Sequence, residues 1–250
     1  MTTTPDIQHI QREQYVFPYH HISFIDDRGQ GSRVRILSWG FEYLIYNTRL
    51  ASIVQSLEPR SVLDVGCGDG YFLGQLHDKI PTRVGVDIDE RALKFAQAFH
   101  PHVDYRKADV KDLSERFDVV CAVEVLEHIP DNDISSFLRA MASRVAADGS
   151  IVVSVPTVNE PLNRKHFRHY DLPLLEKQFA EALPEYVLEH SEYFYRRTFA
   201  ERLYRRLTSS FLFRGEIPLL RRFVWGAAKR SAISADSRNG LHLIARFACR

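Results

Sequence analysis

The stretch from Ser61 to Tyr71 reads SVLDVGCGDGY, and it decides the fold. Its first half is rich in valine and leucine, as a buried strand is, and its second half carries glycine at positions 66, 68 and 70. Glycines at such a turn allow a sharp change of direction and let a ligand approach the backbone closely. The segment GYFLGQLHD, residues 70–78, then predicts a helix. The stretch therefore predicts a strand, a glycine-rich turn and a helix, and by itself the turn either binds a ligand or serves only to reverse the chain.

The same alternation of strand and helix continues along the chain. Strands are predicted at residues 61–66, 83–88, 103–109, 117–125 and 150–156, and helices at residues 70–78, 90–99 and 133–146. Parallel strands need a crossover between them, and a helix usually provides it. The sequence therefore predicts an α/β fold, a doubly wound Rossmann-like sheet, with its binding site at the carboxyl ends of the strands.

Composition excludes several other classes of protein. The chain has 250 residues, 45% of them hydrophobic, and a formal net charge of +1, so no overall charge draws it to nucleic acid or lipid. Its three cysteines are far apart and show no C-x-x-C spacing, which argues against a disulfide framework and a zinc site. The N-terminal sequence has no secretion signal, and no apolar run is long enough to span a membrane. We expect a cytoplasmic protein, with or without attachment to the inner surface of the membrane.

Acidic residues follow two more of the predicted strands. Asp87 ends the second strand, where a carboxylate can accept hydrogen bonds from both hydroxyls of a ribose. Asp109 follows the third strand and can accept from an adenine amine, while Val110 offers a backbone amide. Tyr71 stands where a dinucleotide fingerprint has glycine, and no Gly-Lys-Ser/Thr follows, so phosphate binding is disfavoured. The pattern predicts a site for an adenosine without a phosphate.

In this order and spacing, VLDVGCGDGYF, GVDIDE, ADVKDL and FDVVCAVEVLEHI resemble the motifs of class I S-adenosylmethionine-dependent methyltransferases. The resemblance covers roughly residues 60 to 180. It implies a seven-stranded, mostly parallel sheet that ends in an antiparallel hairpin, with residues 186–194 and 241–249 as its strands. It also implies that S-adenosylmethionine is held by the following residues: Asp64, Gly66, Cys67, Gly68 and Gly70 at the methionine part, Asp87 at the ribose, Asp109 and Val110 at the adenine, and Ile88 and Glu124 elsewhere in the cofactor pocket.

The segment EVLEHI places Glu124, Glu127 and His128 directly after the fourth strand. An acceptor hydroxyl needs a general base or a metal ion, and two carboxylates with an imidazole can supply either. The stretch KHFRHYD, after the fifth strand, adds His169 as the first choice of a further residue and His166 as the second. We therefore consider His128, His169, His166 and Glu127 as catalytic residues. Glu124, Glu127, His128 and His169 are the candidate ligands of magnesium, manganese or zinc.

Three interpretations of this cluster stay open: a general base or pocket lining, a divalent metal site, and a structural role at the start of a helix. The arrangement resembles two metal-using branches of the family. These are the small-RNA 3′-terminal 2′-O-methyltransferases and the O-methyltransferases of quinone biosynthesis.

Segments outside the core differ from a minimal methyltransferase. We divide the chain into an aromatic segment with a lid helix (1–58), the cofactor-binding core (59–193), a basic-aromatic insertion (194–238) and the last strand (239–250). Residues 33–57 have the periodicity of an amphipathic helix, which either covers the cofactor, with His20 and His21 facing the acceptor, or packs on the sheet. Residues 191–230 hold ten Lys/Arg and three Asp/Glu, interleaved with aromatic residues. Such a segment suits an anionic membrane surface, a phosphorylated acceptor, RNA, a dimer contact or a solvated helix face.

The acceptor is predicted from weaker signals. The stretch HFRHYD, residues 166–171, is similar to segments of methyltransferases that accompany surface-polysaccharide and glycolipid assembly. The first prediction is therefore O-methylation of a sugar hydroxyl on a glycan, glycolipid or nucleotide-sugar. The alternatives are the 2′-hydroxyl at an RNA 3′ end, which makes nucleic acid a less favoured partner, and a quinone or other aromatic hydroxyl. A relative that binds the cofactor without catalysis, as a regulatory subunit, is the non-enzymatic alternative.

Overall fold

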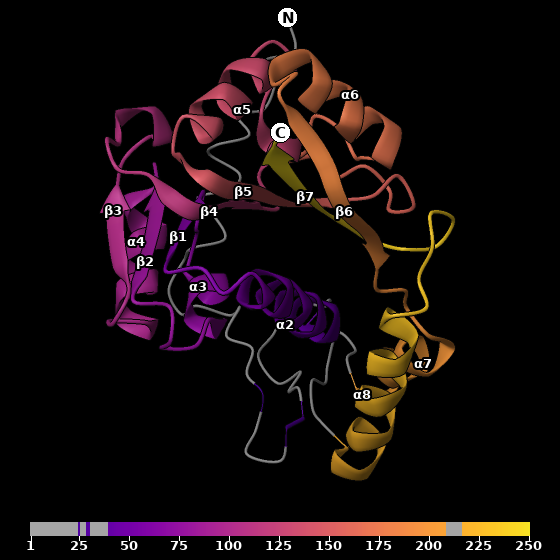
Figure 1. Cartoon of the computed structure of the whole chain (residues 1–250). Coiled ribbons are helices and arrows are strands. Elements are labelled where there is room, and N and C mark those ends of the chain that lie inside the picture. Colours follow the sequence, from indigo (N-terminus) through magenta and orange to yellow (C-terminus); the bar gives the residue numbers. More distant parts are fainter. Residues whose placement is uncertain (1–24, 26–28, 31–39, 209–216) are drawn as a thin grey trace, which may run out of the picture.

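A seven-stranded sheet forms the centre of the computed structural model, which describes residues 25, 29–30, 40–208 and 217–250 (Figure 1). The strands are β1 Ser61–Val65, β2 Thr82–Asp87, β3 Asp104–Lys107, β4 Phe117–Val123, β5 Val145–Pro156, β6 Tyr186–Phe194 and β7 His242–Cys249. Their order is β3-β2-β1-β4-β5-β7-β6. The first five strands pair in parallel, and β7 lies antiparallel between β5 and β6. The predicted fold class, with its final antiparallel hairpin, is confirmed.

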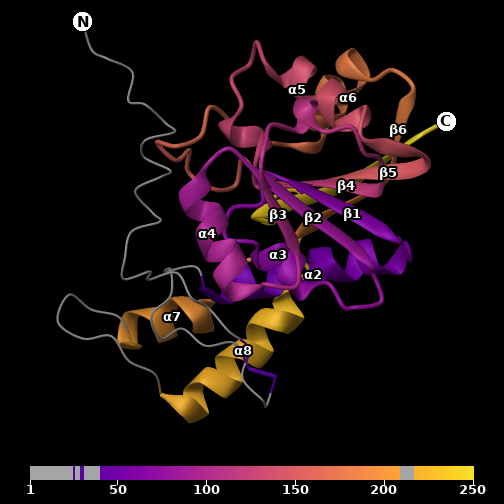
Figure 2. The same ribbon diagram turned by 90° about the vertical axis from the view of Figure 1, so that its left-hand side faces the viewer.

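Helices cover both faces of this sheet (Figures 1 and 2). They are α2 Gly40–Ser56, α3 Tyr71–Gln75, α4 Glu90–Phe99, α5 Ile134–Ala142, α6 Leu172–Ala182, α7 Phe199–Thr208 and α8 Pro218–Ala232, with short 3-10 helices η1 Val110–Asp112 and η2 Leu126–His128. One face packs against α5 and α6, and the other against α2, α3 and α4. None of the helices in the described part of the chain is long and apolar enough to cross a bilayer.

Each face of the sheet has its own apolar core. Neighbouring residues of β1 point to opposite faces, so that Val62 joins the core beneath α2 while Leu63 joins the core beneath α5 and α6. Because both faces are covered, the central strands are apolar throughout rather than alternating. In the second core the rings of Phe179 (α6) and Phe247 (β7) stack at 3.6 Å, which fixes α6 on the sheet.

The fifth strand starts earlier than the sequence predicts. The helix predicted at residues 133–146 ends at Ala142, and β5 already begins at Val145. Val145 pairs with Phe117, and the register then shifts before Val119. Gly149 lies at this irregularity, where an added Cβ would be 2.7 Å from the carbonyl oxygen of Asp118. Strand pairing therefore overrides the helical periodicity at the end of this segment.

The N-terminal helix packs on the sheet over its described length. Buried residues of α2, including Leu44, Leu50 and Val54, belong to the same core as β1 and β4 residues. Its first turn nevertheless borders the carboxyl ends of the strands, because Tyr43 contacts Tyr71 at a ring distance of 4.8 Å. His20, His21 and the start of the predicted lid lie outside the described residues.

Two helices, α7 and α8, connect β6 to β7. They pack against each other and α8 also packs against α2, so that the pair lies beside the sheet layers rather than on them (Figure 1). Phe41 of α2 joins them, since its ring stacks on Tyr204 at 6.0 Å and meets Trp225 edge-on at 5.4 Å. The division of the chain into four segments remains a prediction.

The Phe179–Phe247 stack gives a stability prediction. Phe247→Ala removes a fully buried ring and leaves a cavity, so we expect the free energy of unfolding to fall by about 3–5 kcal/mol. Urea unfolding followed by circular dichroism measures it. Phe199→Ala is the matched control, because Phe199 is 74% exposed and its replacement should change stability by no more than about 0.5 kcal/mol. Equal losses in the two variants would contradict the assignment of this core.

Candidate active site

The glycine turn after β1 is fixed by its backbone. The amides of Gly66 and Cys67 both donate to the carbonyl oxygen of Val86. Gly66 has a φ of 75°, and an added Cβ would lie 2.8 Å from Val125, so only glycine fits there without a shift. Cys67 is buried, and burial raises the pKa of its thiol. A ligand at this turn would therefore meet backbone groups, and the thiol serves packing.

Two aspartates lie behind the turn. The carboxylate of Asp87 accepts hydrogen bonds from the amides of Gly68 (3.0 Å) and Asp89 (2.8 Å), which ties the end of β2 to the glycine turn. Burial raises the pKa of Asp87, although these bonds oppose the shift. Asp64 is fully buried, and burial followed by the charge of Asp87 raises its pKa well above its usual value. Asp87 keeps unused lone pairs for ribose hydroxyls, so its predicted role is compatible with the structure.

The predicted adenine residues, Asp109 and Val110, lie after β3. Asp109 caps η1 by accepting from the amide of Lys111 (3.1 Å), and it also pairs with the Lys111 ammonium group (3.2 Å). This is the helix-capping use of aspartate. Val110 is buried, whereas Ile88 is 62% exposed beside Asp87, where it offers an apolar surface. The contacts of Asp109 and Val110 with adenine, and of Ile88 with the cofactor, stay predictions.

Glu124 occupies a strained position at the end of β4. Its φ is 56°, a left-handed conformation that is unusual for glutamate. Its carboxylate accepts from the hydroxyl of Ser154 (2.8 Å) and faces Nδ1 of His242 (3.2 Å). Burial by itself raises the pKa of Glu124, but His242 and Ser154 outweigh burial and lower it. Glu124 is thus an ionised carboxylate directed toward β7.

His242 is buried between two carboxylates. Its Nδ1 faces Glu124, and its Nε2 faces Glu42 of α2 at 3.1 Å. Burial lowers the pKa of His242, but Glu124 and Glu42 outweigh it and raise that pKa to about 10. The ring is therefore an imidazolium at neutral pH and donates at both nitrogens. Tyr46 stacks on it at 4.2 Å, and Arg197 pairs with the other oxygen of Glu42.

The sequence analysis did not find Glu42, His242 or Arg197. Glu42 and His242 are 200 positions apart, and neither stands in a motif. One signal was available, since the antiparallel last strand must begin at the edge where the parallel strands end, so its first residue, His242, is placed there. Nothing comparable in the sequence indicated that Glu42, on α2, would be its partner.

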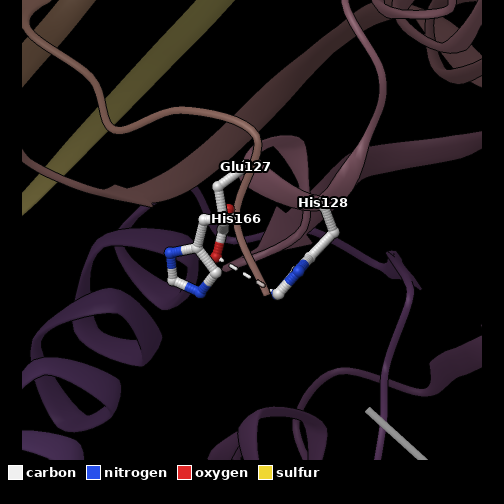
Figure 3. A group of neighbouring side chains, drawn as sticks. All are labelled: Glu127, His128 and His166. Carbon is white, nitrogen blue, oxygen red and sulfur yellow. Dashed lines mark ion pairs between the residues drawn. The ribbon is translucent and has the colours of Figure 1, made fainter. Parts of the chain in front are cut away.

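A second cluster joins Glu127, His128 and His166 (Figure 3). One ligand atom from each lies within 4.8 Å of the others, and Figure 3 shows the carboxylate between the two imidazoles. The Nδ1 of His128 donates to the carbonyl oxygen of Lys165 (2.9 Å), so its Nε2 carries a lone pair and lies 3.7 Å from Glu127. The loop after β5 is therefore brought against η2.

His169 lies behind His166 and outside this cluster. Its Nδ1 faces the carbonyl oxygen of Glu160 (3.0 Å), and its Nε2 faces Nδ1 of His166 (2.7 Å). In the tautomer of His169 whose Nδ1–H donates to the carbonyl oxygen of Glu160, Nε2 accepts from the Nδ1–H of His166, which leaves Nε2 of His166 with a lone pair. The structure thus groups His166 with Glu127 and His128. The candidate metal ligands predicted from the sequence had included His169 and Glu124 in its place.

The protonation states of the cluster suit a cation. Burial lowers the pKa of His166 to about 3, and burial also lowers that of His128, so both rings are neutral. Burial, and then the charge of Glu124, raise the pKa of Glu127 well above its usual value. Its buried Oε2 has no hydrogen-bond partner among the described residues. Two neutral imidazoles and an unpartnered carboxylate oxygen fit a divalent metal ion, which would stabilise the ionised form of Glu127.

Arg168 holds the loop that carries these histidines. Its guanidinium donates to the carbonyl oxygens of Leu126 (2.9 Å) and Ile129 (2.7 Å) and pairs with Asp131. These bonds hold η2 against the loop after β5. The donors of the arginine in HFRHYD are therefore used by the protein's own backbone and by Asp131.

Comparison with known proteins identifies the family. The profile described as a methyltransferase domain matches residues 41–206, which is more than half of the chain. The chain belongs to the methyltransferase domain family. The match includes the glycine turn and the cluster after β4, and it confirms the family resemblance and the prediction of an enzyme.

Named relatives are similar over part of this methyltransferase. It is 38% identical over 120 residues to a ubiquinone biosynthesis O-methyltransferase of Paracidovorax citrulli, covering 44% of this chain and 48% of the relative. A protein of the same name from Pseudomonas entomophila is 37% identical over 112 residues, covering 42% and 47%. The chain thus matches about half the length of these curated relatives.

Solved structures share its fold. Magnesium protoporphyrin IX methyltransferase of Synechocystis with bound S-adenosylmethionine is 14% identical, with a TM-score of 0.60 over 100% of both chains. The N-methyltransferase NodS of Bradyrhizobium japonicum, in complex with S-adenosylhomocysteine, is 16% identical, with a TM-score of 0.56 over 84% of this chain and 87% of that chain. At such identities the likeness concerns the fold alone.

The buried imidazolium gives the second prediction. His242→Gln leaves Glu42 and Glu124 without the cation between them, so we expect the free energy of unfolding to fall by about 3–5 kcal/mol at pH 7. Because the pKa of His242 is raised, its contribution is fully present below its unfolded value of about 6.5 and is lost as the pH rises toward 10. Urea unfolding at pH 7, 8 and 9 should show this decline in the native protein and a flatter profile in the variant.

His102→Gln is the control for this prediction. His102 is exposed, and its replacement should leave both stability and its dependence on pH within about 0.5 kcal/mol of the native protein. If His242→Gln and the native protein showed the same alkaline decline, His242 would not be the titrating cation.

Proposed function

We propose that this methyltransferase transfers the methyl group of S-adenosylmethionine to a hydroxyl on an aromatic ring of the quinone or quinol type. The observation that carries the proposal is the identity of 34–38% with relatives named as ubiquinone biosynthesis O-methyltransferases. The two solved structures described above, whose names give other activities, are 16% and 14% identical. The cluster of Glu127, His128 and His166 adds chemistry that suits a hydroxyl acceptor.

Cofactor binding is proposed at the carboxyl ends of β1 to β4. The glycine turn offers backbone groups, and Asp87 offers two carboxylate oxygens that are already oriented by Gly68 and Asp89. Oriented carboxylates bind ribose hydroxyls with little loss of side-chain entropy. Neighbours of the same fold hold S-adenosylmethionine or S-adenosylhomocysteine, which supports this assignment.

A divalent metal ion is proposed at Glu127, His128 and His166. When bound, such an ion lowers the pKa of a hydroxyl that it contacts and so makes the oxygen a better nucleophile. The alternative is a histidine general base, but burial lowers the pKa of His128, and an imidazole with a pKa of about 3, as in His166, is a poor proton acceptor at pH 7. The same neutral ring is a good metal ligand. His169 and Lys165 would fix the two rings through their Nδ1 atoms.

The sugar acceptor is supported less well than the aromatic one. Its sequence argument was the stretch HFRHYD, and within it Arg168 is bound to Leu126, Ile129 and Asp131 while His166 and His169 bond to each other. These contacts explain the stretch as a support for η2. A sugar hydroxyl and an RNA 3′ end therefore serve as competing outcomes of the acceptor test.

The acceptor test compares three substrates with S-adenosylmethionine as donor: a catechol, a nucleotide-sugar and a short RNA. We expect formation of a methylated catechol and S-adenosylhomocysteine, measured by mass spectrometry. Asp87→Ala should raise the KM for S-adenosylmethionine roughly tenfold or more, because hydrogen bonds from the ribose to a charged group are lost. Asp112→Ala, at an exposed position nearby, should leave that KM unchanged.

Three other outcomes of the acceptor and cofactor-binding tests would change the proposal. Methylation of the sugar or the RNA alone would overturn the aromatic acceptor and retain the enzyme. Binding of S-adenosylhomocysteine in calorimetry, with no product from any acceptor, would favour a cofactor-binding regulatory subunit. Absence of cofactor binding would overturn the whole proposal.

The metal proposal predicts binding of Mn²⁺ or Zn²⁺ in calorimetry, without any substrate. We expect His169→Ala to weaken that binding roughly tenfold, because it loosens the ring of a ligand, and His166→Ala to weaken it further. His102→Ala should bind the ion as the native protein does. An unchanged affinity in His166→Ala, or full activity after exhaustive chelation, would contradict a metal at this cluster.

A further inference from the structure

Helix α7 exposes a row of large apolar side chains. Phe199, Leu203 and Leu207 follow one another at intervals of four residues, so they lie along one side of the helix, here called the α7 stripe. Their exposed fractions are 74%, 45% and 54%. The opposite side of the helix carries the buried Tyr204 and Thr208. A soluble helix normally turns its apolar side inward, whereas α7 has apolar residues on both its inner and its outer side.

Exposed arginines flank the α7 stripe. Arg202, Arg205 and Arg206 are exposed, and none of them forms an ion pair with a carboxylate in the described part of the chain. The one acidic residue of the helix, Glu201, is directed inward to the hydroxyl of Tyr195 and the amide of Thr198. The outer side of α7 is therefore apolar on one flank and positively charged on the other.

Helix α8 repeats this combination. Leu219 and Phe223, here called the α8 stripe, are 83% and 63% exposed, and Arg222 and Arg230 are exposed on the same helix. The two helices pack against each other and extend away from the sheet layers (Figures 1 and 2). Their outer surface is thus distinct from the helices that cover the core.

We propose that the outer surface of α7 and α8 docks on an anionic phospholipid bilayer. Helices that lie in the interface of a membrane have an apolar stripe inserted at the acyl boundary and Lys or Arg residues near the headgroups. Lys and Arg residues close to an anionic surface are attracted to it, and the exposed arginines of α7 complement such a surface. The proposal does not depend on the identity of the methyl acceptor.

Two other occupants fit this surface less well. RNA binding would use several exposed aromatic rings for stacking. Phe199 and Phe223 are exposed, but Tyr204 and Trp225 are buried against Phe41, and the other exposed side chains of the two stripes are the aliphatic Leu203, Leu207 and Leu219. A symmetric dimer through α7 would bring the unpaired arginines of two copies close together, which is unfavourable. A bilayer satisfies the apolar stripe and the charge at once.

This surface is continuous with the active-site edge of the sheet. The segment that joins β6 to α7 includes Arg197, which pairs with Glu42 (2.8 Å) and Glu160 (2.8 Å) beside the site. Docking through α7 and α8 would hold that edge near the membrane. An acceptor dissolved in the bilayer would then reach the site without crossing bulk water.

Vesicle flotation tests the proposal, with the full chain and vesicles of phosphatidylcholine alone or with one third phosphatidylglycerol. We expect binding to the anionic vesicles that weakens with added salt. Leu203→Ser/Leu207→Ser should lower the partition coefficient roughly tenfold or more, and Arg202→Gln/Arg205→Gln should lower it on anionic vesicles alone. Phe99→Ser, on the exposed side of α4, is the matched control and should bind as the native chain does.

Each variant is first checked by circular dichroism and by its affinity for S-adenosylhomocysteine, which should match the native chain. No binding of the native chain to anionic vesicles would overturn the proposal, and so would equal binding by the α7 variants. A concentration-dependent dimer abolished by Leu203→Ser/Leu207→Ser, with no vesicle binding, would assign the surface to a second copy. Binding of RNA by the native chain, without binding of anionic vesicles, would likewise contradict the membrane assignment.

Discussion

The direction of the strands determines where the chemistry of this protein is assembled. Because β1 to β5 run in parallel, their carboxyl ends meet along one edge of the sheet, and the antiparallel β7 begins at that same edge. The parallel strands place the glycine turn, Asp87 and Glu124 at this edge. The antiparallel β7 places His242 there. Hydrogen bonding of the sheet thereby brings together groups that are up to 200 positions apart. The remaining side chains of the site are arranged around this edge.

Electrostatics then divides the edge into two clusters with different properties. In one, the His242 imidazolium keeps Glu124 ionised and binds it to α2 through Glu42. In the other, burial keeps His166 neutral and raises the pKa of Glu127. The charge of Glu124 contributes to both, because it stabilises the imidazolium and disfavours ionisation of Glu127. A rigid charged network thus lies beside a group that can accept a cation or take part in proton transfer.

The connection between β6 and β7 combines the core with an exposed surface. Its aromatic residues Tyr204 and Trp225 face inward onto Phe41, which anchors α7 and α8 beside α2. Its exposed side chains include Arg202, Arg205 and Arg206 together with the residues of the α7 and α8 stripes. Packing of α7 and α8 thus buries some side chains of this connection as an anchor and exposes others as a surface. This separation favours the membrane proposal over the RNA, dimer-contact and solvated-face interpretations, among which the composition alone did not decide.

The sequence by itself determined the α/β class, the order of strands and helices, the final hairpin and the methyltransferase family, because these depend on local periodicity and on motifs of neighbouring residues such as Asp64 to Gly70. It also brought Glu127, His128 and the histidines after β5 to one place, since adjacent strands end side by side. Only the tertiary structure decided that His166 rather than His169 faces Glu127, and that Arg168 supports η2. Those choices depend on which carbonyl oxygens lie within hydrogen-bond reach of each ring, a property of packed loops that residue spacing does not encode.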